Sequence, residues 1–460
     1  MTWAGTLAAV MTAIMMFFLI VNSFQALLLM LAIPELWSHW QLADDEYFHA
    51  LVGTEALPPI SVVATLHDDA ADAPALARML LELQYPRHEV VLVSDSTGES
   101  GSDTLATLTS EFDLYEVPPA FTVNLRTQPV RAYYRSRTHP RLLCVDKEPG
   151  GRGDAINAGL NASRYPHALA VWHNIIFEPD ALLRLTRPFL LDRSVAAVGG
   201  ILRPVNGASI QDDRLVAARV HGWALGSQTI EYMRNFLFQR LGWNRLASNL
   251  IFPGNTVLFK REHMFSVGGF DPDTIIPGVD LDIRLHRHLT DKGINPRMPV
   301  IPDQIAWARV PEDVAGIARA RRSWQRCLWR ALREVAPVPF NPEFGAFGML
   351  ALPYFWIAII IAPFVELAGY AGLVVGAVTG VLDTPFIAAY LAAVVGYGIL
   401  LSVWTVILQL LTFQRTAHRR EIARLLLFAV VESLGYRQLV VWYRASAFFV
   451  DLPPTVQDHG

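Results

Sequence analysis

The chain has 460 residues, of which 52% are hydrophobic and only 17% charged, whereas soluble domains carry about 25% charged residues. This composition excludes a disordered chain, a disulfide scaffold and a coiled coil, and it indicates segments that lie in lipid. The net charge of −4 offers no basic surface for nucleic acid, so no nucleic-acid partner is expected.

The first predicted element is a membrane-spanning helix within residues 1–40. Residues 7–33 carry no formal charge, and about 20 apolar residues are enough to cross a bilayer. No charged segment precedes them and no small-residue cleavage site follows. We therefore expect a retained span rather than a signal peptide.

Residues 55–337 are predicted to form a soluble α/β domain. Short β-branched runs at Ile60–Thr65 and Val90–Asp95 flank Ala73–Gln84, in which apolar residues recur at helical spacing. A helix is also expected after Gly153-Asp154. Further strands are predicted at residues 141–146, 168–173 and 196–201. Alternating buried strands and helices predict a parallel sheet, with ligands beyond the carboxyl ends of its strands.

A second hydrophobic zone occupies residues 340–415 and is interrupted at Asp383-Thr384-Pro385. Basic residues follow it from Arg415 onward and indicate the cytoplasmic side. If the soluble domain is cytoplasmic as well, two spans lie in this zone and three in the chain, with a fourth left open. Residues 416–460 are predicted to form interfacial or bundle-packed helices and a tail. No buried ion pair of the kind found in transporters is expected in the membrane part.

Several segments, in their order and spacing, carry a resemblance to a known family. They are ISVVATLHDD, EVVLVSDST, VDKEPGGRGDAINAGLNASRYP, FEPDALLRL, SVGGFDPDT, LDIRLHRHL and RRSWQRCLW. The chain resembles the membrane-embedded family 2 glycosyltransferases, which include cellulose-, hyaluronan- and chitin-synthase-like enzymes. The resemblance covers nearly the whole chain. It implies a GT-A-like, Rossmann-type α/β domain between N- and C-terminal transmembrane helices, facing the cytoplasm from a bacterial-type inner membrane.

The resemblance implies nucleotide-sugar contacts at Asp69, Asp95, Lys147 and Asp154. Asp95 matches the carboxylate that contacts the nucleobase, although Asp is also a common turn former in Ser-Asp-Ser-Thr-Gly. Lys147, followed by two glycines and Asp154, matches the element that meets phosphate. The alternative for Asp154 is an ordinary acidic residue at the start of a helix. Asp69 matches the acidic residue that ends the family motif at the first strand.

The family's metal motif is altered in this chain. Counting back from Glu178 places Trp172 and Asn174 at the two metal-ligating positions. Trp cannot ligate and a neutral Asn is a weak donor, so no metal site is predicted, and Mg²⁺ or Mn²⁺ is expected only if the protein is active. His173 between them could hold a softer ion, but a lone His is more often satisfied by the fold.

The catalytic base and the acceptor motif are altered as well. Gly278 occupies the position of the base, and glycine cannot accept a proton. Asp280 is the nearest substitute, but it lies two residues further on, and a base must approach its proton to about 2.6–3.2 Å. Trp324 alone survives from the acceptor motif. Its indole suits a sugar ring, although an interfacial Trp is equally well explained by amphipathicity. The arginines at residues 319–333 predict a headgroup-facing helix edge, or binding of an anionic polysaccharide or lipid phosphate.

These losses predict a membrane glycosyltransferase-like protein without catalysis, acting as a subunit or scaffold in cell-envelope polysaccharide or glycolipid assembly. Its expected partners are membrane lipid, a nucleotide or nucleotide-sugar, a glycan and a further protein of the assembly. The alternative is an active inverting family 2 glycosyltransferase that uses a nucleotide-sugar donor with a shifted base or without metal. The fold does not decide between these two functions, because activity depends on the residues of the site.

Overall fold

The computed structural model describes residues 2–43, 57–66, 72–95, 98–119, 123–171, 175–204, 209–211, 214–216, 222–246, 249, 256–272, 279–308, 310–334, 338–413 and 419–450. The chain divides into two compact units. The sheet unit comprises Ser38–Arg203 and Ser248–Arg309, and the helical unit comprises Met1–Trp37, Pro204–Ala247 and Val310–Gly460.

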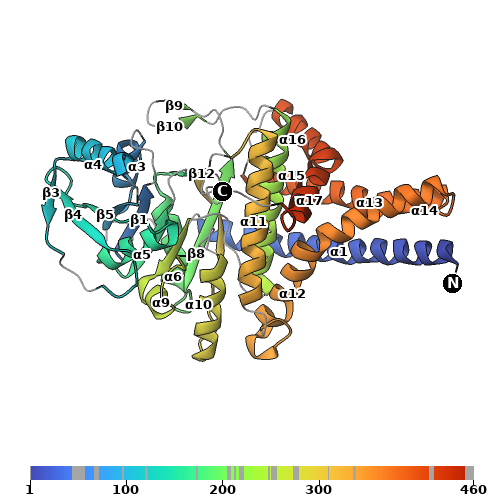
Figure 1. The fold of residues 1–460 in the computed structure, drawn as a ribbon, viewed down its shortest axis with the longest axis horizontal. Helices are drawn as coiled ribbons and strands as arrows, with labels where there is room; N and C mark the ends of the chain where they lie inside the picture. Colours follow the sequence, from blue (N-terminus) through green and yellow to red (C-terminus); the bar gives the residue numbers. More distant parts are fainter. Residues whose placement is uncertain are drawn as a thin grey trace. The chain divides into compact units, whose positions relative to one another are not determined.

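The sheet unit is built on a ten-stranded sheet in the order β3-β4-β5-β2-β1-β6-β11-β8-β12-β7 (Figure 1). Its centre is parallel: β1 (Ile60–Leu66) lies between β2 (His88–Ser94) and β6 (His167–Val171), and β5 (Leu142–Lys147) pairs with β2. Every residue of β1 and β2 is buried, which explains their continuous apolar sequence.

The flanks of the sheet are antiparallel, in the pairs β3–β4, β4–β5, β11–β6, β11–β8 and β12–β7. These strands are β3 (Leu114–Val117), β4 (Val130–Ser136), β7 (Ile175–Phe177), β8 (Ala197–Pro204), β11 (Val257–Lys260) and β12 (Val300–Ala308). The five predicted strands are present, but the prediction of a parallel sheet is wrong for the flanks. Antiparallel neighbours need no crossover helix, so the alternation of strands and helices does not reveal them.

The helices of the sheet unit are α3 (Ala73–Leu81), α4 (Gly98–Phe112), α5 (Arg152–Ala162), α6 (Ala181–Leu191), α9 (Arg261–Ser266) and α10 (Val279–Asp291). Helix α5 was predicted and matters most for the site. It lies directly on the parallel strands, because a Cβ at Gly159 would be only 2.2 Å from Val63 Cγ1 of β1. This contact fixes the first turn of α5 beside the strand ends.

In the helical unit, the described residues contain four helices long and apolar enough to cross a membrane. These segments are Trp3–His39, Phe347–Val378, Thr384–Leu411 and Ile422–Ser446. The first three match the predicted spans. The sequence leaves a fourth span open and predicts interfacial or bundle-packed helices in this region. Non-helical backbone at Leu434 and Gly435 does divide it into two helices, but together they have the length and composition of a span.

The elements of the helical unit are α1 (Trp3–Ala43), α7 (Trp223–Tyr232), η1 (Met233–Phe238), α8 (Gln239–Leu246), α11 (Val314–Glu334), η2 (Pro342–Phe344), η3 (Phe347–Ala351), α12 (Leu352–Tyr354), η4 (Phe355–Ile361), α13 (Ala362–Val378), α14 (Thr384–Leu391), η5 (Ala392–Gly396), α15 (Tyr397–Phe413), α16 (Arg419–Val431), η6 (Glu432–Tyr436) and α17 (Arg437–Ser446). A two-stranded pair, β9 (Ser209–Gln211) and β10 (Arg214–Val216), belongs to the same stretch of chain.

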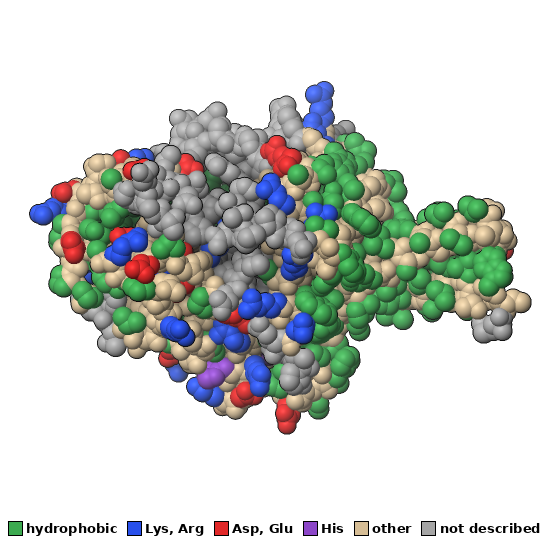
Figure 2. All heavy atoms as spheres, in the orientation of Figure 1, with side chains coloured by type: hydrophobic (Ala, Val, Ile, Leu, Met, Phe, Trp, Pro, Cys, Tyr) green, Lys and Arg blue, Asp and Glu red, His purple; other side chains and the backbone are tan. Residues whose placement is uncertain are grey.

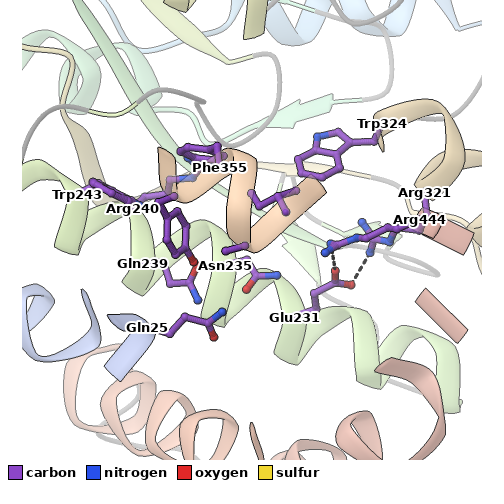
Figure 3. A pocket seen from close by; sticks show the side chains of 13 residues that line it. Gln25, Glu231, Asn235, Gln239, Arg240, Trp243, Arg321, Trp324, Phe355 and Arg444 are labelled. Atoms are coloured by element: carbon purple, nitrogen blue, oxygen red, sulfur yellow. Dashed lines mark hydrogen bonds and ion pairs between the residues drawn. The ribbon is translucent and has the colours of Figure 1, made fainter. Parts of the chain in front are cut away.

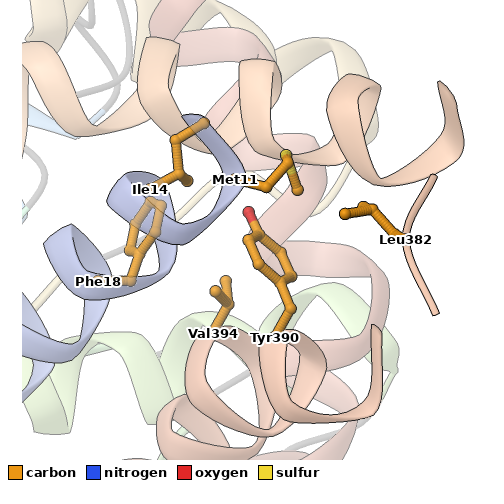
Figure 4. Packing of buried hydrophobic residues seen from close by; sticks show 6 residues of the cluster. All are labelled: Met11, Ile14, Phe18, Leu382, Tyr390 and Val394. Carbon is orange, nitrogen blue, oxygen red and sulfur yellow. The ribbon is translucent and has the colours of Figure 1, made fainter. Parts of the chain in front are cut away.

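An apolar cluster joins the N-terminal helix to the later spans. The cluster consists of Met11, Ile14 and Phe18 from α1 with Leu382, Tyr390 and Val394. Figure 4 shows the Tyr390 ring extending from its helix toward Met11. Large apolar side chains also cover the outside of this unit, as the green surface of Figure 2 shows, and Val378 is 82% exposed. Exposed apolar surface of this extent is what lipid-facing helices carry.

Candidate functional site

Three of the predicted nucleotide contacts, Asp95, Lys147 and Asp154, form one buried cluster. Ser94 pairs with Asp146 in the sheet, so the next residues, Asp95 and Lys147, leave β2 and β5 side by side. Lys147 Nζ lies 2.5 Å from Asp95 Oδ1 and 2.6 Å from Asp154 Oδ1. The Lys147 side chain is completely buried, and both carboxylates are nearly so.

The loop between β5 and α5 closes this cluster. The backbone N–H groups of Gly150 and Gly151 donate to Asp95 at 2.9 Å each, and Gln128 N–H donates to Asp154 Oδ2 at 2.9 Å. Gly151 has a φ of 87°, a conformation that favours glycine. Both oxygens of Asp95 therefore accept hydrogen bonds from the chain, whereas Asp154 accepts one at Oδ2 and has only the ion pair with Lys147 at Oδ1. A nucleotide that contacts Asp95 would have to compete with these partners.

Asp280, the predicted substitute for the catalytic base, is also engaged. It lies in the first turn of α10, is 5% exposed, and accepts from Arg284 Nε at 2.7 Å. The same guanidinium donates to the carbonyls of Val267 and Gly269 at 2.6 and 2.8 Å. The pair thus fastens α10 to the loop that follows α9.

Asn157 on α5 holds the same loop through a second contact. Its Oδ1 accepts from Phe270 N–H and its Nδ2 donates to Phe270 carbonyl, both at 2.8 Å. Further along α10, burial lowers the pKa of His286 to about 4, so its imidazole is neutral at pH 7. This region of the sheet unit is thus held by polar contacts inside the fold.

The other predicted site residues lie outside the described residues. They are Asp69, Trp172, His173, Asn174 and Gly278. Within the described ranges, no group of three or more His, Cys, Asp or Glu side chains could hold a metal ion. Glu178 accepts from Trp307 Nε1 of β12 at 2.6 Å. The described residues therefore offer no set of ligands for a divalent cation.

Trp324 lies in the helical unit, on α11, where it lines a cavity (Figure 3). Arg444 lies over its ring at 5.5 Å from the centroid. Figure 3 shows Glu231 of α7 pointing toward two arginines: its carboxylate is 2.5 Å from Arg321 and 3.5 Å from Arg444. Most of the remaining lining residues are aromatic or amide, and the others are a further arginine and two aliphatic residues: Gln25, Asn235, Gln239, Trp243, Tyr354, Phe355, Arg240, Ala358 and Ile359. Sequence reasoning identified Trp324 and the arginines of α11, which include Arg321, but it did not identify Glu231 or Arg444 as their partners.

A second cavity adjoins the first and shares Gln25, Glu231, Asn235, Ala358 and Arg444 with it. It contains two further buried ion pairs, Arg234–Glu432 at 2.9 Å and Arg437–Glu366 at 3.5 Å. The expectation that the membrane part has no buried ion pair is therefore wrong. The partners lie up to 198 residues apart in the chain, so no local pattern reveals them.

Comparison with known proteins places this fold in a class. No family model matches the chain. It is 26% identical over 346 residues to the beta-monoglucosyldiacylglycerol synthase of Synechocystis sp., and the match covers 72% of this chain and 60% of that protein. The chain therefore spans less than two thirds of that relative's length.

Among solved structures, the mannosyltransferase PcManGT from Pyrobaculum calidifontis, in complex with GDP-Man and Mn²⁺, has a TM-score of 0.50 and 17% identity, covering 89% of this chain and 99% of that one. S. aureus TarS 1-349 in complex with UDP-GlcNAc has a TM-score of 0.40 and 12% identity, covering 83% and 92%, which is too weak a likeness to argue from. The chain has a mixed α/β fold of the glycosyltransferase type. It is glycosyltransferase-like, and one relative is a synthase of a glycolipid.

Proposed function

We propose that this chain is a membrane protein of the family 2, GT-A type that no longer transfers sugar and acts as a subunit or scaffold in glycolipid or envelope polysaccharide assembly. The observation that carries the proposal is the Asp280–Arg284 pair. With Gly278 at the position of the family's base, Asp280 is the nearest carboxylate along the chain, and it is buried at 2.7 Å from a guanidinium.

Arg284 occupies Oδ2 of Asp280 and holds this carboxylate in the first turn of α10. A base must come within about 2.6–3.2 Å of the acceptor hydroxyl, so Asp280 could act only if the acceptor reached its other oxygen or if the pair opened. Arg284 in turn holds the carbonyls of Val267 and Gly269, so releasing Asp280 also loosens the loop. A positioned general base typically accelerates the reaction about 10²- to 10⁴-fold, so its loss removes a large part of the rate enhancement of such a site.

The four apolar helices support a membrane location, and the arginines that follow Phe413 support a cytoplasmic sheet unit. The relative named as a glucosyldiacylglycerol synthase supports a lipid among the partners. Nucleotide contact at Asp95, Lys147 and Asp154 stays a prediction, and the closed cluster gives these residues a competing role in stability.

The test is release of nucleoside diphosphate by the full chain in detergent micelles. UDP-glucose, UDP-N-acetylglucosamine and GDP-mannose would each be supplied with Mg²⁺, with Mn²⁺ and with chelator. We expect no release above that of heat-inactivated protein. The variants are Asp280→Asn and, on the exposed end of the same helix, Asp291→Asn. Release by the wild type that is lost in Asp280→Asn and kept in Asp291→Asn would establish the active inverting transferase instead.

A further inference from the structure

The two adjoining cavities of the helical unit contain more positive than negative side chains. Their lining carries five arginines and three glutamates: Arg234, Arg240, Arg321, Arg437, Arg444, Glu231, Glu366 and Glu432. Arg240 lies over the Phe355 ring at 5.6 Å. Even without Arg240, four arginines face three glutamates, which leaves one positive charge in excess (4 − 3) among the described lining residues.

The excess positive charge is concentrated near Glu231. This single carboxylate serves both Arg321, at 2.5 Å, and Arg444, at 3.5 Å, whereas Arg234 and Arg437 each have a glutamate of their own. The Arg444 contact is longer than a good hydrogen bond. Its Nε is buried and has no hydrogen-bond partner among the described residues. Arg444 therefore has unused donor capacity at the cavity wall.

The second cavity has apolar as well as charged lining residues. Phe18 and Val21 from α1, Leu401 from α15, and Val440 and Val441 from α17 line the second cavity. All three helices belong to segments that are long and apolar enough to cross a membrane. A ligand in this space would meet both apolar side chains and guanidinium groups. This is the pattern that suits a lipid with an anionic headgroup.

An uncompensated charge held away from water is costly, and a phosphate would neutralise it. Guanidinium also binds phosphate in a planar, two-pronged geometry that ammonium cannot match. From these observations we infer that the helical unit binds the phosphate of a membrane phospholipid at Arg444 and Arg321, with the amides of Asn235 and Gln239 in the same lining. The site goes beyond the proposed function and does not depend on it, since it requires no sugar chemistry.

The experiment is native mass spectrometry of the full chain, delipidated in detergent. The probes are phosphatidylglycerol, diacylglycerol with the same acyl chains, and glycerol 3-phosphate. We expect one phosphatidylglycerol to bind about tenfold more tightly than diacylglycerol, a difference of about 1.4 kcal/mol, and glycerol 3-phosphate not to compete. Arg444→Gln should abolish that preference. Arg319→Gln removes the same charge from an exposed position of α11 and should retain it.

A variant that breaks no described ion pair guards against misfolding of Arg444→Gln. Asn235→Leu fills the wall shared by both cavities and should weaken phosphatidylglycerol binding about tenfold. Three results would overturn the inference: equal binding of phosphatidylglycerol and diacylglycerol, equal losses in Arg444→Gln and Arg319→Gln, or full competition by glycerol 3-phosphate. The last result would indicate a free-phosphate site. Each outcome leaves the sugar-turnover result untouched.

Discussion

Replacing Lys147 by methionine tests whether the buried cluster of the sheet unit is a structural element. The change keeps an unbranched chain of similar length but removes the cation between Asp95 and Asp154. In the native chain the cluster carries one positive and two negative charges, and the Lys147 side chain is fully buried. In Lys147→Met two carboxylates would share a nearly dry site without a counter-charge.

The expected cost follows from these contacts. Removing one partner of a buried ion pair costs about 3–5 kcal/mol. Lys147 pairs with two carboxylates at 2.5 and 2.6 Å, which places the expectation in the upper part of that range. The N–H groups of Gly150 and Gly151 still reach Asp95, and Gln128 N–H still reaches Asp154, which keeps the cost from rising further.

Hydrogen exchange on the full chain measures this cost locally. A loss of about 3–5 kcal/mol lowers the protection of core amides about 10²- to 10⁴-fold, and we expect this loss in β2, β5 and α5. The matched control is Arg131→Met, on the neighbouring strand β4. Its pair with Asp146 is 41% exposed on the arginine side, so its loss should cost about 1 kcal/mol or less.

The reasoning fails if Lys147→Met loses no more protection than Arg131→Met. The cluster would then be open in solution, and its residues would be free for a ligand. In that case a nucleoside diphosphate should protect the β5–α5 loop of the wild type but not that of Lys147→Met. This would confirm the predicted nucleotide contact.

The remaining predictions concern single contacts of the same two units. Gly269→Ala should lower the free energy of unfolding by about 2–4 kcal/mol and Gly268→Ala by about 1–2 kcal/mol, as measured by urea denaturation. Both glycines have positive φ, but only a Cβ at residue 269 would clash, at 2.4 Å from Asn157 Oδ1. The lowered pKa of His286, from 6.5 to about 4, means that the unfolded chain binds more protons between these values. The neutral imidazole therefore contributes about 3 kcal/mol to the free energy of unfolding above pH 6.5, and this contribution is lost as the pH falls toward 4. The urea midpoint of the wild type should fall more steeply over this range than that of His286→Gln. Equal slopes would contradict the prediction. Arg234→Leu and Glu432→Leu should each lower the stability of the protein by about 3–5 kcal/mol, measured by thermal melting in micelles. The double variant should lose less stability than either single variant. Additive losses would mean that the two side chains are not coupled.

The parallel centre of the sheet was predictable because both faces of its strands are buried, which makes them read as continuous apolar runs. Strand β4 was missed for the opposite reason. Its residues Val130–Ser136 are mostly half-buried and include two arginines, so neither a continuous apolar run nor strict alternation appears.

The site was predictable only where a motif or a strand end marks its residues. Asp95 and Lys147 end two strands, and the strand pairing brings them together. The pair of Asp280 and Arg284 has the spacing of neighbours on a helix, a signal that was available but not used. No such spacing links Glu231 to Arg444, which lie 213 residues apart.

A different signal would have found the ion pairs of the helical unit. Charged residues within long apolar segments are rare, and they need a partner because lipid offers none. Glu366, Glu432 and Arg437 are such residues, and each is paired in the structure. Their presence therefore predicts buried partners even when the sequence cannot name them.

The two units differ in what their charges leave available for a ligand. In the sheet unit, Asp95 and Asp154 share Lys147, and Asp280 has Arg284, so a new ligand at Lys147 or Arg284 would have to compete with a carboxylate that is already paired. In the helical unit, two guanidinium groups share the carboxylate of Glu231, so an anion gains a partner without breaking one. Displacing a buried partner costs several kcal/mol, while neutralising an excess charge recovers part of that amount. The cavity of the helical unit is therefore the place where an anionic ligand would bind with the smaller cost.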